Sequence, residues 1–363
     1  MLDSVPEIWT TLPAGHYHRD DIYAREKERI FYSSWFCVGR AGEVENPRDY
    51  MVRKVGDESL VVLRDADGAV RAFYNVCPHR GHRVCTATDG KLAGGVMACG
   101  YHQWTFGLDG KLVATPRMMD TPGFDKTHHR LKPVAVQLWE GFVFVNLAEQ
   151  PGAFEPNLGN IGARLHAYNM ATLRPARTAV YDMAANWKIV VENFCECFHC
   201  PGVHPELCHI IPGFRSGKIE QENPHGAIFR EGGRTTNFDA KTARPMISTT
   251  ESQDHQGFRS TTVYPNLLLV LVPDHVQAWT LWPTGPQSTR VVFEWLFEPR
   301  TMARPDFDMN DVGAFMDLVN KQDQDVCERV QEGVQSRAFE HGVYSAGEHL
   351  PRKFNRWVLD RLS

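Results

Sequence analysis

Two short segments that each pair a cysteine with a histidine constrain this chain more than any other feature of its sequence. Cys77-Pro78-His79 is followed, after nineteen intervening residues, by Cys99-Gly100-Tyr101-His102. Each pair is close enough in sequence to lie on one tight loop, and two such loops can converge on one metal centre. Because the four side chains are two thiols and two imidazoles, a structural zinc site is the simplest interpretation.

The distribution of these ligands favours a two-iron cluster over zinc. Zinc fingers usually pair Cys with Cys and His with His, whereas each half of this pattern supplies one of each. In a Rieske [2Fe-2S] centre, two thiolates bind one iron and two imidazoles bind the other, so each loop can reach both irons. His82 and Cys85 are interpreted as packing or supporting groups. We predict that the cluster ligands are Cys77, His79, Cys99 and His102.

Composition limits the classes of function. A chain of 363 residues usually needs more than one hydrophobic core, so two domains are expected. The net charge of −5 offers no basic excess for nucleic acid or an anionic membrane. Without a long apolar run or a signal-peptide pattern, we expect a cytoplasmic protein with no membrane partner. Nine cysteines, an odd number, indicate metal ligands or reactive groups more than a disulfide framework.

Hydrophobic patterning predicts an α+β chain with an all-β domain first. Turn signals cut β-branched and aromatic runs between residues 35 and 147, and Pro156–Gly159 is a candidate linker. An antiparallel sheet flanked by helices is expected to follow. We expect an N-terminal helical segment over 1–36, an all-β domain over 37–148 and a second domain over 149–363, on which the N-terminal segment packs. The main expected elements are helices at 24–31, 187–198 and 310–337 and strands at 261–272, 276–282 and 289–297.

A second candidate site follows the helix predicted over 187–198, which Pro201-Gly202 is expected to stop. His199 and His204 lie five residues apart there. Such a pair alone is more often an ordinary surface or core pair than a metal site. Two histidines and a carboxylate on one face of an octahedron, however, bind ferrous iron and leave positions open for oxygen. Composition alone leaves three carboxylates nearly equal as the third ligand: Asp323, Asp325 and Glu328.

Taken together, the motifs resemble those of the Rieske non-heme iron oxygenases, terminal oxygenase (alpha) subunits. The resemblance covers most of the chain because two independent metal motifs occur in the expected order. It implies that 37–148 is a Rieske domain and that 149–363 is a catalytic domain of the helix-grip type. It also implies a mononuclear Fe(II) bound by His199, His204 and Asp323, with Asp325 as the next candidate. Glu196 takes the place of a carboxylate, Asp in many members, that links the two metal centres across a subunit boundary. The matching segments are 77–81, 99–104, 186–188, 192–194, 196–204 and 322–331, and they include Asn193, which we group with Glu196 as catalytic.

The same resemblance implies partners and an activity. A separate flavin or ferredoxin-type reductase would use NAD(P)H to supply electrons, through the cluster, to iron and O2. The oxygenase would be a homotrimer. The segments 196–207, 264–267 and 273–275 are similar to the branch that oxidises quaternary ammonium compounds such as glycine betaine, stachydrine and carnitine. Hydroxylation of an N-methyl group would then release formaldehyde by N-demethylation.

Substrate recognition remains open at this stage. A quaternary ammonium cation favours aromatic faces. We expect two or three of the following to line the pocket: Phe194, Phe198, Tyr264, Trp279, Trp282, Phe293, Trp295 and Phe297. One alternative is a ring-hydroxylating oxygenase with an aromatic or heteroaromatic substrate. Another is an electron-transfer or metal-stabilised binding module without oxygenase activity.

Four cysteines crowd the second site, and a zinc site is the competing interpretation for them. Thiolate ligands would close the open iron face that oxygen needs. Cysteine also packs well as a small apolar side chain. We therefore expect buried free thiols at Cys195, Cys197, Cys200 and Cys208.

Overall fold

A computed structural model describes residues 9–118, 120–154, 162, 165–216, 220–223, 226–229, 235–247 and 257–363. The chain divides into two compact units, Phe31–Gly152 and, in the other unit, the residues up to Ile30 together with those from Ala153 onward. We propose that these units are the two domains, with limits near the expected 36 and 148. The candidate linker at 156–159 lies outside the described residues.

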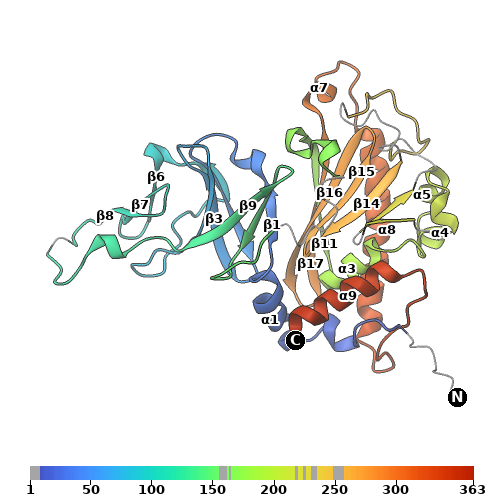
Figure 1. Cartoon of the computed structure of the whole chain (residues 1–363), viewed down its shortest axis with the longest axis horizontal. Coiled ribbons are helices and arrows are strands. Elements are labelled where there is room, and N and C mark those ends of the chain that lie inside the picture. The colour runs from blue at the N-terminus through green and yellow to red at the C-terminus, as the bar shows by residue number, and fades with distance from the viewer. Residues whose placement is uncertain are drawn as a thin grey trace. The chain divides into compact units, whose positions relative to one another are not determined.

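The unit Phe31–Gly152 is built from antiparallel strands, as predicted (Figure 1). A seven-stranded sheet has the order β1-β10-β9-β4-β3-β2-β5, and a three-stranded sheet has the order β6-β7-β8. The strands of the larger sheet are β1 Phe36–Arg40, β2 Asp49–Val55, β3 Glu58–Arg64, β4 Val70–Tyr74, β5 Asp89–Lys91, β9 Pro133–Trp139 and β10 Phe142–Asn146. Those of the smaller sheet are β6 Val96–Ala98, β7 Thr105–Gly107 and β8 Leu112–Ala114.

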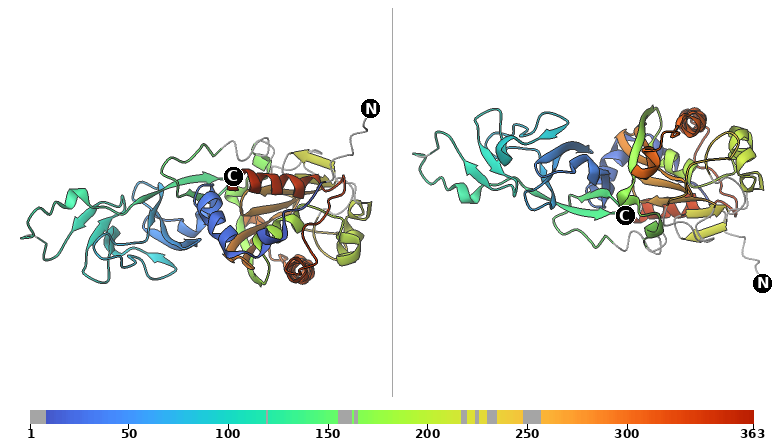
Figure 2. Two further views of the ribbon diagram at one scale, coloured as in Figure 1. Left: turned by 90° about the horizontal axis from the view of Figure 1, so that it is seen from below. Right: turned by 90° about the horizontal axis from the view of Figure 1, so that it is seen from above.

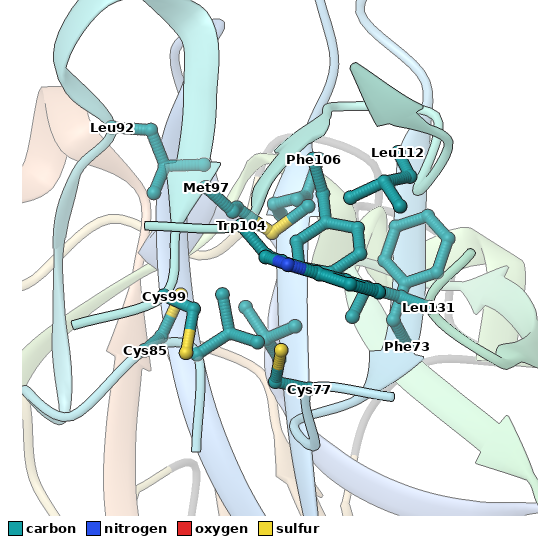
Figure 3. Close-up of a cluster of buried hydrophobic side chains, with 13 residues drawn as sticks. Phe73, Cys77, Cys85, Leu92, Met97, Cys99, Trp104, Phe106, Leu112 and Leu131 are labelled. Atoms are coloured by element: carbon teal, nitrogen blue, oxygen red, sulfur yellow. The ribbon is translucent and has the colours of Figure 1, made fainter. Parts of the chain in front are cut away.

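A hydrophobic cluster joins the smaller sheet of this unit to the larger one. Figure 3 shows the cysteines Cys77, Cys85 and Cys99 at one end of this cluster, with the rings of Phe73 and Phe106 farther along it. Trp104 is 3% exposed and lies within the cluster. Burial of such large apolar side chains stabilises the loops that carry the cysteines.

The other unit contains one seven-stranded antiparallel sheet with the order β11-β17-β16-β15-β14-β13-β12. Residues 261–272 were predicted as one strand, but they belong to two strands separated by a turn at Tyr264–Asn266. Proline in that turn cannot donate to a strand ladder, which explains the break. The strands are β11 Arg174–Met183, β12 Glu220–Asn223, β13 Gly226–Phe229, β14 Phe258–Val263, β15 Leu267–Val272, β16 His275–Gly285 and β17 Ser288–Phe297.

Helices flank this sheet, which confirms the predicted class of fold. In Figure 2, α8 is seen end-on and α9 from the side, so the two helices cross at a large angle. Among the described residues, no helix is both long and apolar enough to cross a membrane. The helices are α1 Asp20–Glu26, α3 Trp187–Phe194, α4 Cys200–Val203, α5 Pro205–Ile210, α6 Gly213–Ser216, α7 Pro299–Met302, α8 Asn310–Val334 and α9 His349–Leu362.

The helix predicted over 187–198 is shorter than expected. It begins after Asn186, whose side chain accepts a hydrogen bond from the Lys188 N–H at 2.9 Å, and it ends at Phe194. Pro201-Gly202 does not stop this helix but lies inside α4. Proline is compatible with the first turn of a helix because no intrahelical hydrogen bond is required of its nitrogen there. The residues between α3 and α4 therefore form a turn, and this turn carries Glu196 and His199.

Candidate metal centres and active site

The two Cys/His loops of the β unit close in the same way. The Cys77 N–H donates to the carbonyl of His82 at 2.8 Å, and the Cys99 N–H donates to the carbonyl of Trp104 at 2.8 Å. In each loop the N–H four residues after the cysteine donates back to the cysteine carbonyl, at 2.9 Å from Gly81 and 3.0 Å from Gln103. Those two residues have φ of 74° and 61°. Two loops of matching geometry can thus present matching ligands to one centre.

The four predicted cluster ligands lie together. Cys77 and Cys99 are each 2% exposed, and their thiols interact with one another. The His79 and His102 rings, which are half-exposed, have centroids 4.6 Å apart. Burial raises the pKa of the Cys77 thiol, and a bound metal cation would favour its thiolate form. Buried thiols on one side and outward imidazoles on the other fit a Rieske cluster, with thiolates and imidazoles on different irons.

Two neighbouring residues support this group. The indole of Trp104 stacks on the His79 ring, with centroids 4.7 Å apart and planes 7° apart. His82 Nδ1 lies 3.9 Å from the Cys99 sulfur. Cys85 lies in the same cluster as Cys77 and Cys99, and its backbone is fixed by Asn75: its N–H donates to the Asn75 side chain at 2.8 Å and its carbonyl accepts from the same amide at 2.7 Å. These positions agree with the interpretation of His82 and Cys85 as supporting groups.

In the other unit, one atom each from His199, His204 and Asp323 lies within 4.8 Å of the other two. His204 Nε2 is 2.8 Å from Asp323 Oδ1, and His199 Nε2 is 3.5 Å from the same oxygen. His204 and His199 come from the turns around α4, whereas Asp323 comes from α8. This donor set of two imidazoles and one carboxylate is the one expected for ferrous iron.

Both imidazoles are oriented by a partner on Nδ1, which leaves Nε2 directed at the carboxylate. His199 Nδ1 contacts Glu196 Oε1, and His204 Nδ1 lies 2.7 Å from the Gln322 side-chain oxygen. A hydrogen bond at Nδ1 fixes the tautomer and the ring orientation of a metal-binding histidine. The arrangement therefore fits a metal bound through the two Nε2 atoms and Asp323.

The three carboxylates that composition left nearly equal as the third metal ligand all lie on helix α8, but their surroundings differ. Asp323 continues the buried stripe of Val319 and Cys327, which lie four residues before and after it. Asp325 is exposed and pairs with Arg329 at 3.0 Å. Glu328 accepts from the Gln324 amide at 2.8 Å and from the Ala184 N–H at 3.1 Å. Among the three, Asp323 is the carboxylate that meets the histidines.

The electrostatics of the three side chains are coupled. Burial would raise the pKa of Asp323, but hydrogen bonds from His199 and His204 lower it to about 2. Burial would lower the pKa of His199, but Asp323, Cys200 and Glu196 raise it to about 12. Asp323 is thus held as a carboxylate, the form that binds a cation.

A pocket adjoins these three residues, with about 850 Å³ of empty space that includes its open mouth. Its walls are formed by the strands, by α3 and α8, and by the turn and short helices α4 to α6 that follow α3. Of the aromatic candidates named from the sequence, the described lining contains Phe194 and Trp279. Tyr264 instead packs against Phe354 and Trp357, and Phe198 is 46% exposed. Aromatic lining residues that the sequence analysis did not identify are Tyr181, Phe214 and Phe258.

Tyr181 and Gln322 are further site residues that the sequence analysis missed. Tyr181 donates to Asp317 Oδ1 at 2.6 Å and accepts from the Asn320 amide at 3.3 Å. Its position in a strand gave no signal, because aromatic residues on strands usually belong to the core. Gln322, in contrast, could have been suspected because it adjoins Asp323.

Glu196 and Asn193 lie between this pocket and a second one. Both residues, together with His199, line each pocket. The second pocket is also lined by Glu192, Tyr344 and Glu348. Glu196 accepts hydrogen bonds from the Phe198 N–H and, at 3.4 Å, from the His199 N–H. Hydrogen bonds from the turn thus fix the Glu196 carboxylate, which lies between His199 and the second pocket.

Comparison with known proteins agrees with both sites. Residues 34–125 match the Rieske [2Fe-2S] domain, and residues 170–363 match the catalytic domain of the ring-hydroxylating alpha subunit. The chain belongs to the Rieske non-heme iron oxygenases. It is a monooxygenase or dioxygenase component with a Rieske cluster and a mononuclear iron, as predicted. Members of this family are terminal oxygenases that need a reductase and act on small molecules.

Two curated relatives are informative. The chain is 32% identical to the glycine betaine monooxygenase oxygenase subunit of Chromohalobacter salexigens, over 92% of this chain and 82% of that protein. It is 40% identical to the carnitine monooxygenase oxygenase subunit of Acinetobacter pittii, over 55% of this chain and 54% of that protein.

Solved structures agree with the fold. A quaternary ammonium Rieske monooxygenase, CntA, in complex with L-carnitine has a TM-score of 0.79 at 27% identity, covering 99% of this chain and 97% of that one. Naphthalene 1,2-dioxygenase from a Rhodococcus species, bound to indole, has a TM-score of 0.78 at 20% identity, covering 98% and 94%. The second likeness shows the fold alone.

Proposed function

We propose that this Rieske oxygenase hydroxylates an N-methyl group of a small quaternary ammonium, betaine-like substrate and so releases formaldehyde. The observation that carries the proposal is the aromatic lining beside the His199, His204 and Asp323 group. The Trp279 and Phe194 rings both face that pocket, with centroids 5.6 Å apart. Aromatic faces attract a quaternary ammonium ion, which cannot donate hydrogen bonds. The relatives named for glycine betaine and carnitine support the same substrate class.

Hydrogen bonds hold the aromatic wall in place. Trp279 Nε1 donates to Asn320 Oδ1 at 3.1 Å, and the Asn320 amide donates to Tyr181. Asn320 lies one turn before Asp323 on α8. The helix that supplies the carboxylate therefore also positions Trp279. We infer that this coupling places the N-methyl group of the substrate beside the metal ligands.

We propose the following assignment of the metal ligands. Cys77 and Cys99 would bind one iron of the cluster, and His79 and His102 the other. His199, His204 and Asp323 would hold the mononuclear iron. When bound, the irons supply electron transfer and oxygen activation. The polypeptide orients the rings through Glu196 and Gln322, excludes water with apolar walls, and binds the substrate cation.

We further propose that the electrons arrive across a subunit boundary. Glu196 contacts the proposed iron ligand His199 and also lines the second pocket. A Rieske histidine of a neighbouring protomer could reach Glu196 through that opening. This arrangement would require a homo-oligomer, and we propose a trimer supplied by a flavin or ferredoxin-type reductase that oxidises NAD(P)H. A related structure is described in terms of inter-subunit electron transfer.

Formaldehyde release tests the substrate class. The purified oxygenase, with a reductase and NADH, is incubated with glycine betaine, carnitine, stachydrine and choline, and in parallel with indole and naphthalene. We expect formaldehyde in proportion to O2 consumed with at least one quaternary amine. Hydroxylated rings without formaldehyde would overturn the proposal in favour of ring hydroxylation. A protein that holds neither iron nor acid-labile sulfide would overturn the assignment of both metal centres.

A further inference from the structure

Cys197 and Cys200 lie on either side of Phe198 and His199 and face the same pocket. They are 9% and 3% exposed, and both line the pocket next to the proposed iron ligands. The Cys200 N–H donates to the Cys197 carbonyl at 3.2 Å, so the segment is a tight turn. Within this turn the two thiols are close enough to interact by hydrogen bonding. Cysteines three residues apart in such a turn are a common arrangement for reversible disulfide chemistry.

The Cys200 sulfur lies beside the metal site but outside it. It is 3.8 Å from His199 Nε2. In the described part of the chain, however, the converging donor atoms come from His199, His204 and Asp323. Its position allows a reagent that enters the substrate pocket to reach sulfur without first displacing a metal ligand.

The other nearby cysteines differ in their surroundings. Cys195 faces Thr262, with 3.6 Å between its sulfur and the threonine hydroxyl oxygen. Cys208, on α5, is buried and does not belong to the described lining of the pocket. Cys327 lines the pocket from α8 but lies far from the turn in sequence. Cys195 and Cys208 therefore provide matched internal controls.

We propose that Cys197 and Cys200 form a peroxide-reactive dithiol, a modification site that closes into a disulfide around His199. The oxidant is hydrogen peroxide, which forms when two electrons and two protons reduce O2 without substrate hydroxylation. One thiolate attacks the peroxide, which breaks the O–O bond, gives a sulfenic acid and releases water after proton transfer. The second thiol then displaces the sulfenic oxygen, so that the S–S bond forms and a second water leaves.

Closing this disulfide changes the metal site. A disulfide needs its sulfurs about 2.05 Å apart, which constrains the turn that carries His199. We expect the oxidised protein to lose mononuclear iron and activity while the cluster remains. Dithiothreitol followed by ferrous iron should restore both. The disulfide would thus inactivate an oxygenase that reduces O2 without hydroxylating its substrate.

Thiol mapping tests the proposal on the metal-loaded protein. The protein is treated with hydrogen peroxide, alkylated and digested with trypsin, and the peptide 189–215, which carries four cysteines, is fragmented in a mass spectrometer. We expect it to carry two alkyl groups, on Cys195 and Cys208, where the untreated peptide carries four, and to be lighter by two hydrogens than a peptide with free thiols at Cys197 and Cys200. Cys195→Ser should leave the linkage intact. Cys197→Ser should abolish the linkage and direct Cys200 toward sulfinic acid.

Several results would overturn the proposal. One is a linkage that includes Cys208 or Cys195 in place of the proposed pair. Another is a peptide that stays fully reduced while peroxide removes the mononuclear iron. The wild-type peptide map decides between these outcomes, so the result does not depend on whether a variant folds.

Discussion

His204 Nε2 lies 2.8 Å from Asp323 Oδ1, although the two residues are 119 positions apart in the chain. The contact joins the turn after α4 to the middle of α8. It brings an imidazole and a carboxylate together at the wall of an apolar pocket, where an unpaired charge would be costly. The same contact therefore accounts for a candidate metal site and for the docking of α8 against the active-site turns.

Replacement of Asp323 should remove the mononuclear iron selectively. We expect Asp323→Ala to abolish iron binding at this site and all oxygenase activity, because two imidazoles alone hold ferrous iron weakly. The visible spectrum of the Rieske cluster should remain. Iron analysis together with that spectrum measures both effects. Asp325→Ala is the matched control, since Asp325 is exposed on the same helix, and equal iron loss in both variants would reject the assignment.

Glu196 should affect turnover more than metal content. Glu196→Gln keeps the length of the side chain but removes its charge, so both metal centres should stay bound. We expect turnover to fall roughly 10- to 100-fold, as for other residues that orient metal ligands. Single-turnover oxidation of the reduced cluster locates the slowed step. Glu196→Asp, the residue that many members of the family carry, should recover part of the rate, and unchanged turnover in Glu196→Gln would refute the role.

Trp279 should contribute to substrate affinity. If its face binds a quaternary ammonium group, Trp279→Ala should raise KM roughly 5- to 30-fold, the range for a loss of about 1–2 kcal/mol. Trp279→Phe should retain much of the affinity because it keeps an aromatic face. Trp282→Ala is the control, as Trp282 lies on the same strand but outside the described pocket lining. Similar KM values for the two alanine variants would contradict the cation-binding role.

Glu192 should make stability depend on pH. Burial raises its pKa to about 7, although Tyr17, Lys188 and Asn355 act to lower it. The unfolded carboxyl has a pKa of roughly 4.3, so the folded state binds the extra proton between about pH 4.3 and pH 7. The free energy of unfolding should therefore fall as pH rises through this window.

The size of this effect can be measured with an isosteric variant. The free energy of unfolding should fall by about 2 kcal/mol across this pH window. The loss is smaller than the full pKa shift of Glu192 would give, because the carboxyl keeps some contact with solvent. Glu192→Gln can still accept the hydrogen bond that Tyr17 donates at 2.8 Å. Its urea unfolding curves at pH 5 and pH 7.5 should thus differ less than those of the wild type. An unchanged pH slope would show that another group is responsible.

The buried pair of Glu26 and Lys188 should be important for folding. Both side chains are fully buried, and Lys188 Nζ lies 2.5 Å from Glu26 Oε1. Glu26 also accepts from the Trp187 indole at 2.9 Å. Glu26→Gln should reduce the free energy of unfolding by about 3–5 kcal/mol, because it leaves a buried ammonium uncompensated. Chemical denaturation measures this, and the double variant Glu26→Gln with Lys188→Met should recover much of the loss.

The Rieske cluster could be predicted from sequence, since its proposed ligands lie on two tight loops. Each loop contains its own cysteine, histidine and closing hydrogen bonds, so local spacing carries most of the information. The alternation and turn signals of the β unit are also local, which is why that unit was predicted well. The end of α3 was not predicted correctly. The turn after Phe194 is stabilised by the Glu196 side chain and not by a helix-breaking residue.

The second centre shows the limit of the sequence. The sequence determined that two histidines follow a helix. The apolar spacing of Val319 and Cys327 could also have indicated that Asp323 faces inward. The meeting of α8 with the histidine turns, and the choice of Trp279 and Phe194 among many aromatic residues, were decided by tertiary packing. Periodicity specifies which face of an element is buried. Which other elements meet that face depends on contacts between residues far apart in the chain, and no local pattern encodes those contacts.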